Sequence, residues 1–231
     1  MPENPVARSA LIEPGSATRV ADGWEVCAGV PDGDVAVADL SAVAKVLVKA
    51  PAEPQVEAAL GARFARAAWV GDHLVTGASP GEWLVLAPVG SADGTVQRYR
   101  SLLADATNGL TSVIDLTHGR ALMRVSGKAA TDLLSRVTAV DLDDRFVPQG
   151  SALRTSLARV VTDVVRDDVA GCPSYLLHCE RSSGRYLVES LLAAGADLDA
   201  RLVAGAPPWP DHPSSDLGEG TPNRGEQIHE A

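Results

Sequence analysis

The sequence predicts an α+β fold that is internally duplicated, with β-β-α-β-β-β-α units at about residues 35–108 and 109–205. In the second unit, the apolar run 113–116 and the apolar run 121–125 flank a polar corner, as two strands joined by a turn do. In the first unit, Asp39-Leu40-Ser41 stands where Asp115-Leu116-Thr117 stands later. An amphipathic helix follows both strand pairs. A period this long with two copies indicates duplication within one domain, since a solenoid needs at least three repeats.

The composition and charge of the chain are typical of a globular protein with a hydrophobic core. The chain has 231 residues, 45% of them hydrophobic, which provides enough apolar surface for a core. Its start, Met1-Pro2-Glu3-Asn4-Pro5, lacks the basic end and apolar stretch of a signal peptide, so we expect a soluble, cytoplasmic protein. The three cysteines, Cys27, Cys172 and Cys179, fit free thiols in a reducing compartment. The net charge of −10 argues against a nucleic-acid partner.

The first half begins with an arm, residues 1–34, in which only residues 24–28 resemble a strand. Within the first unit, a helix that begins near Pro54 should bury one face, and Gly71-Asp72 should join two strands. A strand at 83–87 follows, and Ser91 should cap the next helix. The inward residues expected for these two helices are Val56, Ala59, Leu60 and Phe64, then Val96, Tyr99, Leu102 and Leu103.

The second unit repeats this order. Strands at 111–116 and 121–126 precede a helix from residue 128, a short strand at 139–142 and a long β-branched run at 152–165. The last strand, 175–179, leads to a helix that Ser182 or Ser183 should cap, with Tyr186, Leu187, Leu191 and Leu192 inward. Residues 206–231 form an acidic, Pro-rich tail with too little apolar surface to order it.

Two patterns resemble hydrolytic sites. Gly77-Ala78-Ser79-Pro80-Gly81 matches the nucleophile elbow, but that motif needs the backbone N–H of the residue after the serine, and Pro80 has none. We therefore interpret it as a turn between strands. Asp115 and His118 could form a base oriented by a carboxylate. Their place at a hairpin corner favours local hydrogen bonds instead.

Two further clusters contain metal-ligand types. Cys172, His178, Cys179 and Glu180 carry suitable atoms, but adjacent residues of a strand point to opposite faces. Asp141, Asp143 and Asp144 lack the glycine-centred loop of a calcium site. We assign no catalytic residue and no metal ligand from these patterns.

Several segments, in order, resemble the gamma subunit of heterotetrameric sarcosine oxidase, which is itself similar to the folate-binding domain of the glycine-cleavage aminomethyltransferase. The likeness covers about residues 6–200. It is carried by R-S-A-L at 8–11, D-L-S-A-V-A-K-V-L-V-K at 39–49, S-P-G-E-W-L-V-L at 79–86, D-L-T-H-G-R-A-L-M-R-V-S-G-K-A-A-T-D-L-L at 115–134, P-Q-G-S-A-L-R-T-S-L-A-R-V at 148–160 and E-R-S-S-G-R-Y-L-V-E-S-L at 180–191.

The resemblance implies two β-β-α-β-β-β-α units that exchange strands. It also implies a complex with alpha, beta and delta subunits that converts sarcosine to glycine, passes the one-carbon unit to tetrahydrofolate and releases hydrogen peroxide. FAD, FMN, NAD, zinc and tetrahydrofolate are then expected in the partner subunits, and the gamma chain carries no catalytic residue.

One position could be the remnant of a folate site. The active aminomethyltransferases place an essential carboxylate in a G-G-x-x-D-D-type loop, and the matching run here is A-R-V-V-T-D-V-V at 158–165. Only Asp163 is retained, without the glycines that let backbone approach a ligand closely. Asp163 is therefore either this remnant or an ordinary carboxylate at a strand edge.

Three functional hypotheses follow. The favoured one is a non-catalytic gamma subunit of a sarcosine oxidase complex, and the alternative is a stand-alone folate-binding or folate-dependent one-carbon (aminomethyl) transferase. The third is an unrelated interaction domain on the same scaffold. Trp24, Trp69 and the arm of residues 1–34 are candidates for partner contact, because aromatic residues are enriched in interface cores.

Overall fold

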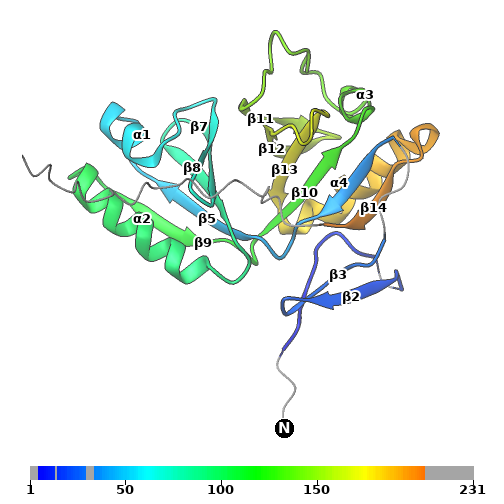
Figure 1. Cartoon of the computed structure of the whole chain (residues 1–231), viewed down its shortest axis with the longest axis horizontal. Coiled ribbons are helices and arrows are strands. Elements are labelled where there is room, and N and C mark those ends of the chain that lie inside the picture. The colour runs from blue at the N-terminus through cyan, green and yellow to red at the C-terminus, as the bar shows by residue number, and fades with distance from the viewer. Residues whose placement is uncertain (1–4, 14, 30–33, 206–231) are drawn as a thin grey trace, which may run out of the picture.

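The computed structural model describes residues 5–13, 15–29 and 34–205, which form three sheets and the helices that cover them (Figure 1). The two larger sheets have the strand orders β6-β7-β8-β5-β9 and β11-β12-β13-β10-β4-β14, and the small sheet has the order β1-β3-β2. Residues of β7 and β8 pack against residues of β10, β12 and β13, so one apolar cluster lies between the two larger sheets. The fold is mixed α+β, as the sequence predicted. The expected tail lies outside the described residues.

The five-stranded sheet consists mostly of the first unit. Its strands are β5 (Ala44–Lys49), β6 (Ala67–Val70), β7 (His73–Ser79), β8 (Glu82–Ala87) and β9 (Ser112–Asp115). Helices α1 (Pro54–Leu60) and α2 (Ala92–Ala106) cover it and close a core around Trp83, Tyr99 and Leu103. Proline at the start of α1 loses no hydrogen bond, because the first N–H groups of a helix have no intrahelical partner.

The six-stranded sheet consists mostly of the second unit. It contains β4 (Ala36–Asp39), β10 (Arg120–Ser126), β11 (Ala152–Leu157), β12 (Val160–Arg166), β13 (Ser174–Glu180) and β14 (Arg201–Ala204). Helices α3 (Ala130–Ser135) and α4 (Arg181–Ala194) pack on it around Leu133, Leu187 and Leu191. The short 3-10 helix η1 (Ala196–Leu198) leads into β14, which the sequence pattern did not reveal.

The two units exchange their first strands. Strand β4 pairs with β10 of the second unit, and β9 pairs with β5 of the first. Both exchanged strands end in the same local structure: Asp39 Oδ1 accepts the N–H of Ser41 at 3.0 Å, and Asp115 Oδ1 accepts the N–H of Thr117 at 2.8 Å. An aspartate side chain that binds the N–H two residues on turns the chain without a glycine. The exchange means that neither larger sheet can be completed by one unit alone.

The N-terminal arm is more ordered than the sequence predicted. Strands β1 (Ala7–Arg8), β2 (Thr18–Ala21) and β3 (Trp24–Cys27) form the small sheet, where one strand was expected. Trp24 is 6% exposed and stacks on His118, with ring centroids 4.7 Å apart. The hypothesis that Trp24 contacts a partner is therefore wrong. Its ring joins the small sheet to the corner between β9 and β10.

Two strand predictions in the second unit were wrong. Residues 139–142 form no strand, although Leu142 is buried. The run 152–165 is not one strand but the hairpin of β11 and β12, which turns at Ala158 and Arg159. Both turn residues have positive φ, 46° and 70°. Two-residue hairpin turns with two positive φ values usually contain Asn or Gly, so the sequence carried no signal for this one.

Four predicted details of the helices also need correction. Phe64 lies beyond the end of α1 and is 48% exposed, and Tyr186 on α4 is 51% exposed, so neither faces a core. Helix α4 begins at Arg181 with Glu180 at the N-cap position, so Ser182 and Ser183 lie inside the helix. Ser91 does precede α2, but its hydroxyl donates to the carbonyl of Pro88 at 2.7 Å.

None of the helices in the described ranges has the length and apolar character needed to cross a membrane.

Candidate functional site

Asp163 lies in a cluster of charged side chains between the two larger sheets. Its Oδ1 accepts Nε of Arg154 at 2.6 Å, its Oδ2 accepts Nη2 of Arg154 at 3.0 Å, and Oδ2 lies 3.3 Å from Nδ1 of His178. Arg154 also donates from Nη2 to Oε1 of Glu82 at 2.5 Å. Lys49 pairs with the other oxygen of Glu82 at 3.2 Å. The cluster thus bridges strands of both sheets.

Strand register explains this arrangement. Arg154 on β11 is directly opposite Asp163 on β12, and Asp163 is directly opposite His178 on β13. Directly opposed residues place their side chains on the same face of a sheet, within reach of one another. Glu82 stands at the first position of β8, so the other sheet presents it to Arg154. Three consecutive strands of one sheet therefore supply Arg154, Asp163 and His178, and β8 of the other sheet adds Glu82, which is distant in sequence.

The electrostatics of the cluster hold Asp163 ionised. Burial raises the pKa of Asp163, but hydrogen bonds from His178 and Arg154 outweigh it and lower the pKa to about 2. Burial lowers the pKa of His178, with Asp163 opposing. A neutral His178 that donates from Nδ1 to Asp163 leaves Nε2 as an acceptor, and this buried atom has no partner among the described residues.

The space beside these residues is small. His178, Asp163, Arg154 and Glu82 line a cavity of about 10 Å³. Such a volume accommodates about one water molecule, which would satisfy Nε2 of His178. A pterin ring does not fit there, and both oxygens of the carboxylate it would meet are already bound by Arg154. The arrangement therefore resembles a structural link between sheets more than a ligand site.

The structure resolves the pattern that matched a nucleophile elbow. Ser79 ends β7 and is directly opposite Glu82, the first residue of β8, so Pro80 and Gly81 form a two-residue turn. Gly81 has a φ of 69°, which suits the third position of a turn that has proline at the second. The interpretation as a turn is confirmed.

Asp115 and His118 do not act on each other. The carboxylate of Asp115 accepts the N–H of Thr117, whose hydroxyl oxygen accepts the N–H of Lys45 at 3.1 Å. His118 stacks on Trp24. The preference for local hydrogen bonds at this corner is confirmed for Asp115, and the imidazole serves packing.

The residues of metal-ligand type are dispersed. His178 faces Asp163, whereas Cys179 is buried in the core of the six-stranded sheet. Asp143 pairs with Arg145 at 2.8 Å, and Asp144 pairs with Arg166. In the part of the chain that the structure describes, no three His, Cys, Asp or Glu side chains are grouped as a metal site requires.

Trp69 is only partly buried. It packs against the cluster between the sheets, and its Nε1 donates to Oδ1 of Asp167 at 3.4 Å. Asp167 in turn pairs with the buried Arg124 at 2.6 Å. These contacts give Trp69 an internal structural role at the seam between the two units.

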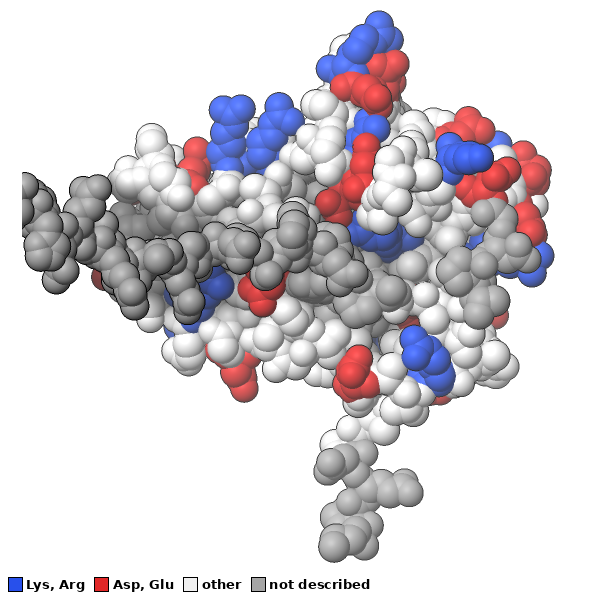
Figure 2. Space-filling view, in the orientation of Figure 1, with Lys and Arg blue, Asp and Glu red and all other residues white. Residues whose placement is uncertain are grey.

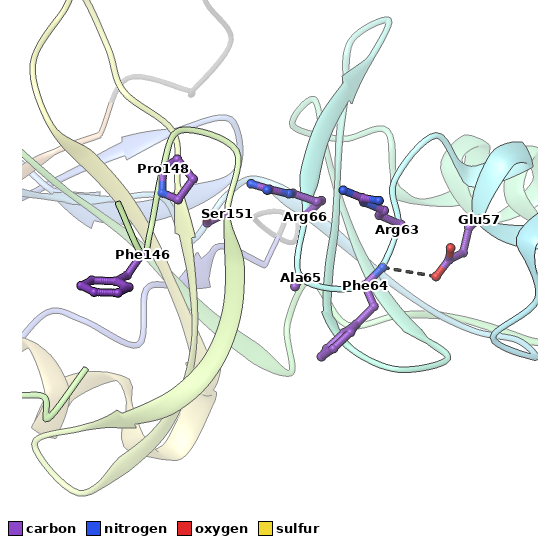
Figure 3. A pocket seen from close by; sticks show the side chains of 8 residues that line it. All are labelled: Glu57, Arg63, Phe64, Ala65, Arg66, Phe146, Pro148 and Ser151. Carbon is purple, nitrogen blue, oxygen red and sulfur yellow. Dashed lines mark hydrogen bonds between the residues drawn. The ribbon is translucent and has the colours of Figure 1, made fainter. Parts of the chain in front are cut away.

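Sequence reasoning missed an open hollow where the two units meet, which we call the arginine hollow. It has a volume of about 410 Å³, and its lining residues are Glu57, Arg63, Phe64, Ala65, Arg66, Phe146, Pro148 and Ser151. Figure 3 shows Arg63 and Arg66 extending in the same direction, toward the segment that carries Pro148. Basic side chains project from the surface near α1 and β7 in Figure 2. The only sequence signal was the spacing of two arginines around a phenylalanine in A-R-F-A-R, residues 62–66.

Comparisons with known proteins give a family and a fold. A family model described as "Sarcosine oxidase, gamma subunit family" matches residues 50–197. A chain of the heterotetrameric sarcosine oxidase from Corynebacterium sp. U-96, solved with pyrrole 2-carboxylate, is similar with a TM-score of 0.61 and 22% identity, over 76% of this chain and 91% of that one. The glycine cleavage system aminomethyltransferase T from Bartonella henselae is similar with a TM-score of 0.62 and 15% identity, over 82% of this chain and 56% of that one. A comparison with curated proteins finds no match.

Proposed function

The chain belongs to the sarcosine oxidase gamma subunit family, and from this premise we propose that it is a non-catalytic subunit that assembles with the flavin-bearing subunits of a heterotetrameric sarcosine oxidase. The complex would convert sarcosine to glycine, pass the one-carbon unit to tetrahydrofolate and release hydrogen peroxide in the cytoplasm. The proposal places FAD, FMN, NAD, zinc and tetrahydrofolate in the alpha, beta and delta partners.

The state of Asp163 supports the non-catalytic part of the proposal. A carboxylate that is to meet a substrate amine needs an open approach and a free oxygen. Asp163 instead has Arg154 on both oxygens, His178 beside Oδ2 and a cavity of only about 10 Å³ next to it. The same observation counts against the stand-alone folate-binding or aminomethyl transferase alternative.

The repeated order of elements supports a second proposal, that the two units are copies of one ancestral unit. Each runs β-β-α-β-β-β-α, from β4 to α2 and from β9 to α4. Each also donates its first strand to the other sheet and ends that strand at an aspartate that binds the N–H two residues on. Such coincidence is expected of a duplication that preserved both local turns and strand pairing.

Calorimetry with tetrahydrofolate tests the assignment of roles. The isolated chain should show no binding at micromolar concentrations, because the pterin would have to displace Arg154 from Asp163. Micromolar binding that Asp163→Ala abolishes would favour the transferase alternative. A matched control is Asp143→Ala, which removes a carboxylate that is bound to an exposed arginine at the surface.

Affinity purification tests the proposed assembly. When the chain is tagged in its native host, the eluate should contain flavin-bearing chains in a fixed stoichiometric ratio, and it should oxidise sarcosine. Recovery of the chain alone would contradict the proposal.

A further inference from the structure

We propose that the arginine hollow is the docking site for an acidic segment of a partner chain. In this mode a carboxylate of the partner lies between Arg63 and Arg66, and an apolar side chain next to it packs against Phe64 and Phe146. The inference rests on the proposed function, because it requires a partner protein, and it adds the surface and the chemistry of the contact.

The charge of the hollow matches an acidic partner. Arg63 and Arg66 form no ion pair or side-chain hydrogen bond with another described residue, whereas nearby arginines of the second unit are bound to carboxylates, as Arg154 is to Asp163 and Arg166 to Asp168. The acidic residue that lines the hollow, Glu57, directs Oε1 to the N–H of Phe64 at 3.3 Å. Two free guanidinium groups on a chain of net charge −10 match a carboxylate, which arginine binds through parallel N–H groups.

The hollow also exposes aromatic side chains. The whole chain contains two phenylalanines, and both line this hollow. Phe64 is 48% exposed and Phe146 is 65% exposed, although burial of a phenylalanine side chain is worth about 1.5–3 kcal/mol. They come from different units, and Figure 3 shows them on opposite sides of the hollow. Exposed aromatic rings beside arginines are the composition of an interface core.

The backbone around the hollow is fixed in advance of binding. Ala65 has a φ of 63°, which is strained for a residue with a side chain. Its N–H donates to the carbonyl of Gly77 at 2.8 Å, and its carbonyl accepts the N–H of Ala152 at 3.1 Å, so both units hold it. A Cβ on Gly77 would lie 2.7 Å from the carbonyl oxygen of Arg63, so this close approach requires glycine. The strained residue fixes Phe64 and Arg66 on either side of it, which reduces the entropy lost on binding.

Size is consistent with this occupant. A volume of about 410 Å³ falls in the range of about 300–1,000 Å³ typical of pockets that hold small molecules or side chains. The hollow thus has room for a few side chains of a peptide segment rather than for a folded domain. The remainder of the interface would lie around it.

The test is photocrosslinking within the assembly. The photoreactive p-benzoylphenylalanine is introduced in place of Phe146 in the tagged full-length chain, expressed in the native host together with its partners. After irradiation, mass spectrometry identifies the peptide that is joined to position 146. We expect a partner-chain peptide that contains Asp or Glu beside an apolar residue.

A matched pair of variants measures the contribution of charge. Arg63→Gln with Arg66→Gln should weaken retention of the partner chains by at least about tenfold, since truncation of a charge in a desolvated contact costs that much or more. Arg98→Gln with Arg159→Gln makes the same change in net charge at two exposed arginines that are likewise free of ion pairs with described residues, and it should leave retention unchanged. Circular dichroism should show equal melting temperatures for both double variants.

The outcomes separate this inference from the proposed function. In one set of results, partner chains co-elute while position 146 crosslinks to residues 206–231 of the same chain, crosslinks to a second copy of the chain, or forms no crosslink. Each of these results refutes the docking site and leaves the subunit assignment standing. Equal retention of both double variants also refutes it. If the wild-type chain elutes without partners, the proposed function fails and the docking site fails with it.

Discussion

At the scale of residues, Asp163 and Lys45 show two contrasting ways in which the chain buries an ionisable side chain. Asp163 is compensated by Arg154 and His178. Lys45 is fully buried, and its Nζ donates to the carbonyls of Ser41 at 2.8 Å and Val43 at 2.7 Å, with the Trp24 ring 5.9 Å away. A neutral amine has two N–H donors, which match these two carbonyls. Burial lowers the pKa of Lys45 from the ordinary 10.5 to about 7, with Asp39 and Asp115 opposing.

Lys45 should therefore make stability depend on pH. Between pH 7 and 10.5 the folded protein has lost the proton that the unfolded chain keeps, so unfolding takes up a proton and the free energy of unfolding rises with pH. Chemical denaturation at a series of pH values gives the free energy of unfolding as a function of pH. In this range the free energy should rise more steeply for the wild type than for Lys45→Met, by up to about 1.4 kcal/mol per pH unit. Equal slopes, or an NMR titration of Lys45 near 10.5, would refute this expectation.

Asp163→Asn tests the link between the sheets. The amide cannot replace the ion pair with Arg154, so the free energy of unfolding at pH 7 should fall by about 2–3 kcal/mol. The control Asp143→Asn breaks a solvent-exposed pair with Arg145 and should lower the free energy of unfolding much less than Asp163→Asn does. Because the pKa of Asp163 is about 2 when folded against an ordinary 3.8, its contribution is present above pH 3.8 and is lost as the pH falls toward 2. Equal losses in the two variants would show that the cluster adds no stability.

At the scale of elements, hydrophobic periodicity located most strands and helices, and its failures have identifiable causes. The hairpin at Ala158 and Arg159 uses positive φ without Asn or Gly, so the run 152–165 read as one strand. Strands β1, β2 and β14 have two to four residues each, too few for a clear alternation. The arginine hollow was missed because its walls come from segments some eighty residues apart in sequence. Asp163 was identified only through the family resemblance.

Gly127 tests a junction between elements. It connects β10 to α3 with a φ of 124°, and a Cβ there would lie 2.2 Å from the carbonyl oxygen of Asp34. Gly127→Ala should therefore lower the free energy of unfolding by more than about 1 kcal/mol. Gly94→Ala is the matched control, because Gly94 lies in α2 with open space around it, and this variant should stabilise by up to about 1 kcal/mol. Thermal denaturation of both proteins measures the difference, and a neutral Gly127→Ala would contradict the described backbone.

At the scale of the whole molecule, the exchange of β4 and β9 joins the two units, because each of the two larger sheets contains a strand from the other unit. The local hydrophobic pattern of the sequence could not predict this exchange, because the exchange depends on pairing between distant segments. Only the resemblance to the sarcosine oxidase gamma subunit implied it. The surface carries exposed apolar side chains at Phe64, Leu110, Phe146 and Val161. We expect the chain made alone to self-associate despite its charge, and light scattering of the purified chain would show this. A stable monomer at micromolar concentration would argue against a surface made for partners.

The measurement that tests the central claim most directly is sarcosine-dependent production of hydrogen peroxide by two preparations. One is the chain alone, and the other is the chain co-expressed with the flavin-bearing chains of its native host and purified through its own tag. The account predicts one stable assembly that consumes sarcosine and releases peroxide, and an isolated chain that does neither. Sarcosine turnover by the isolated chain, or an inactive preparation from which every flavoprotein is absent, would contradict it.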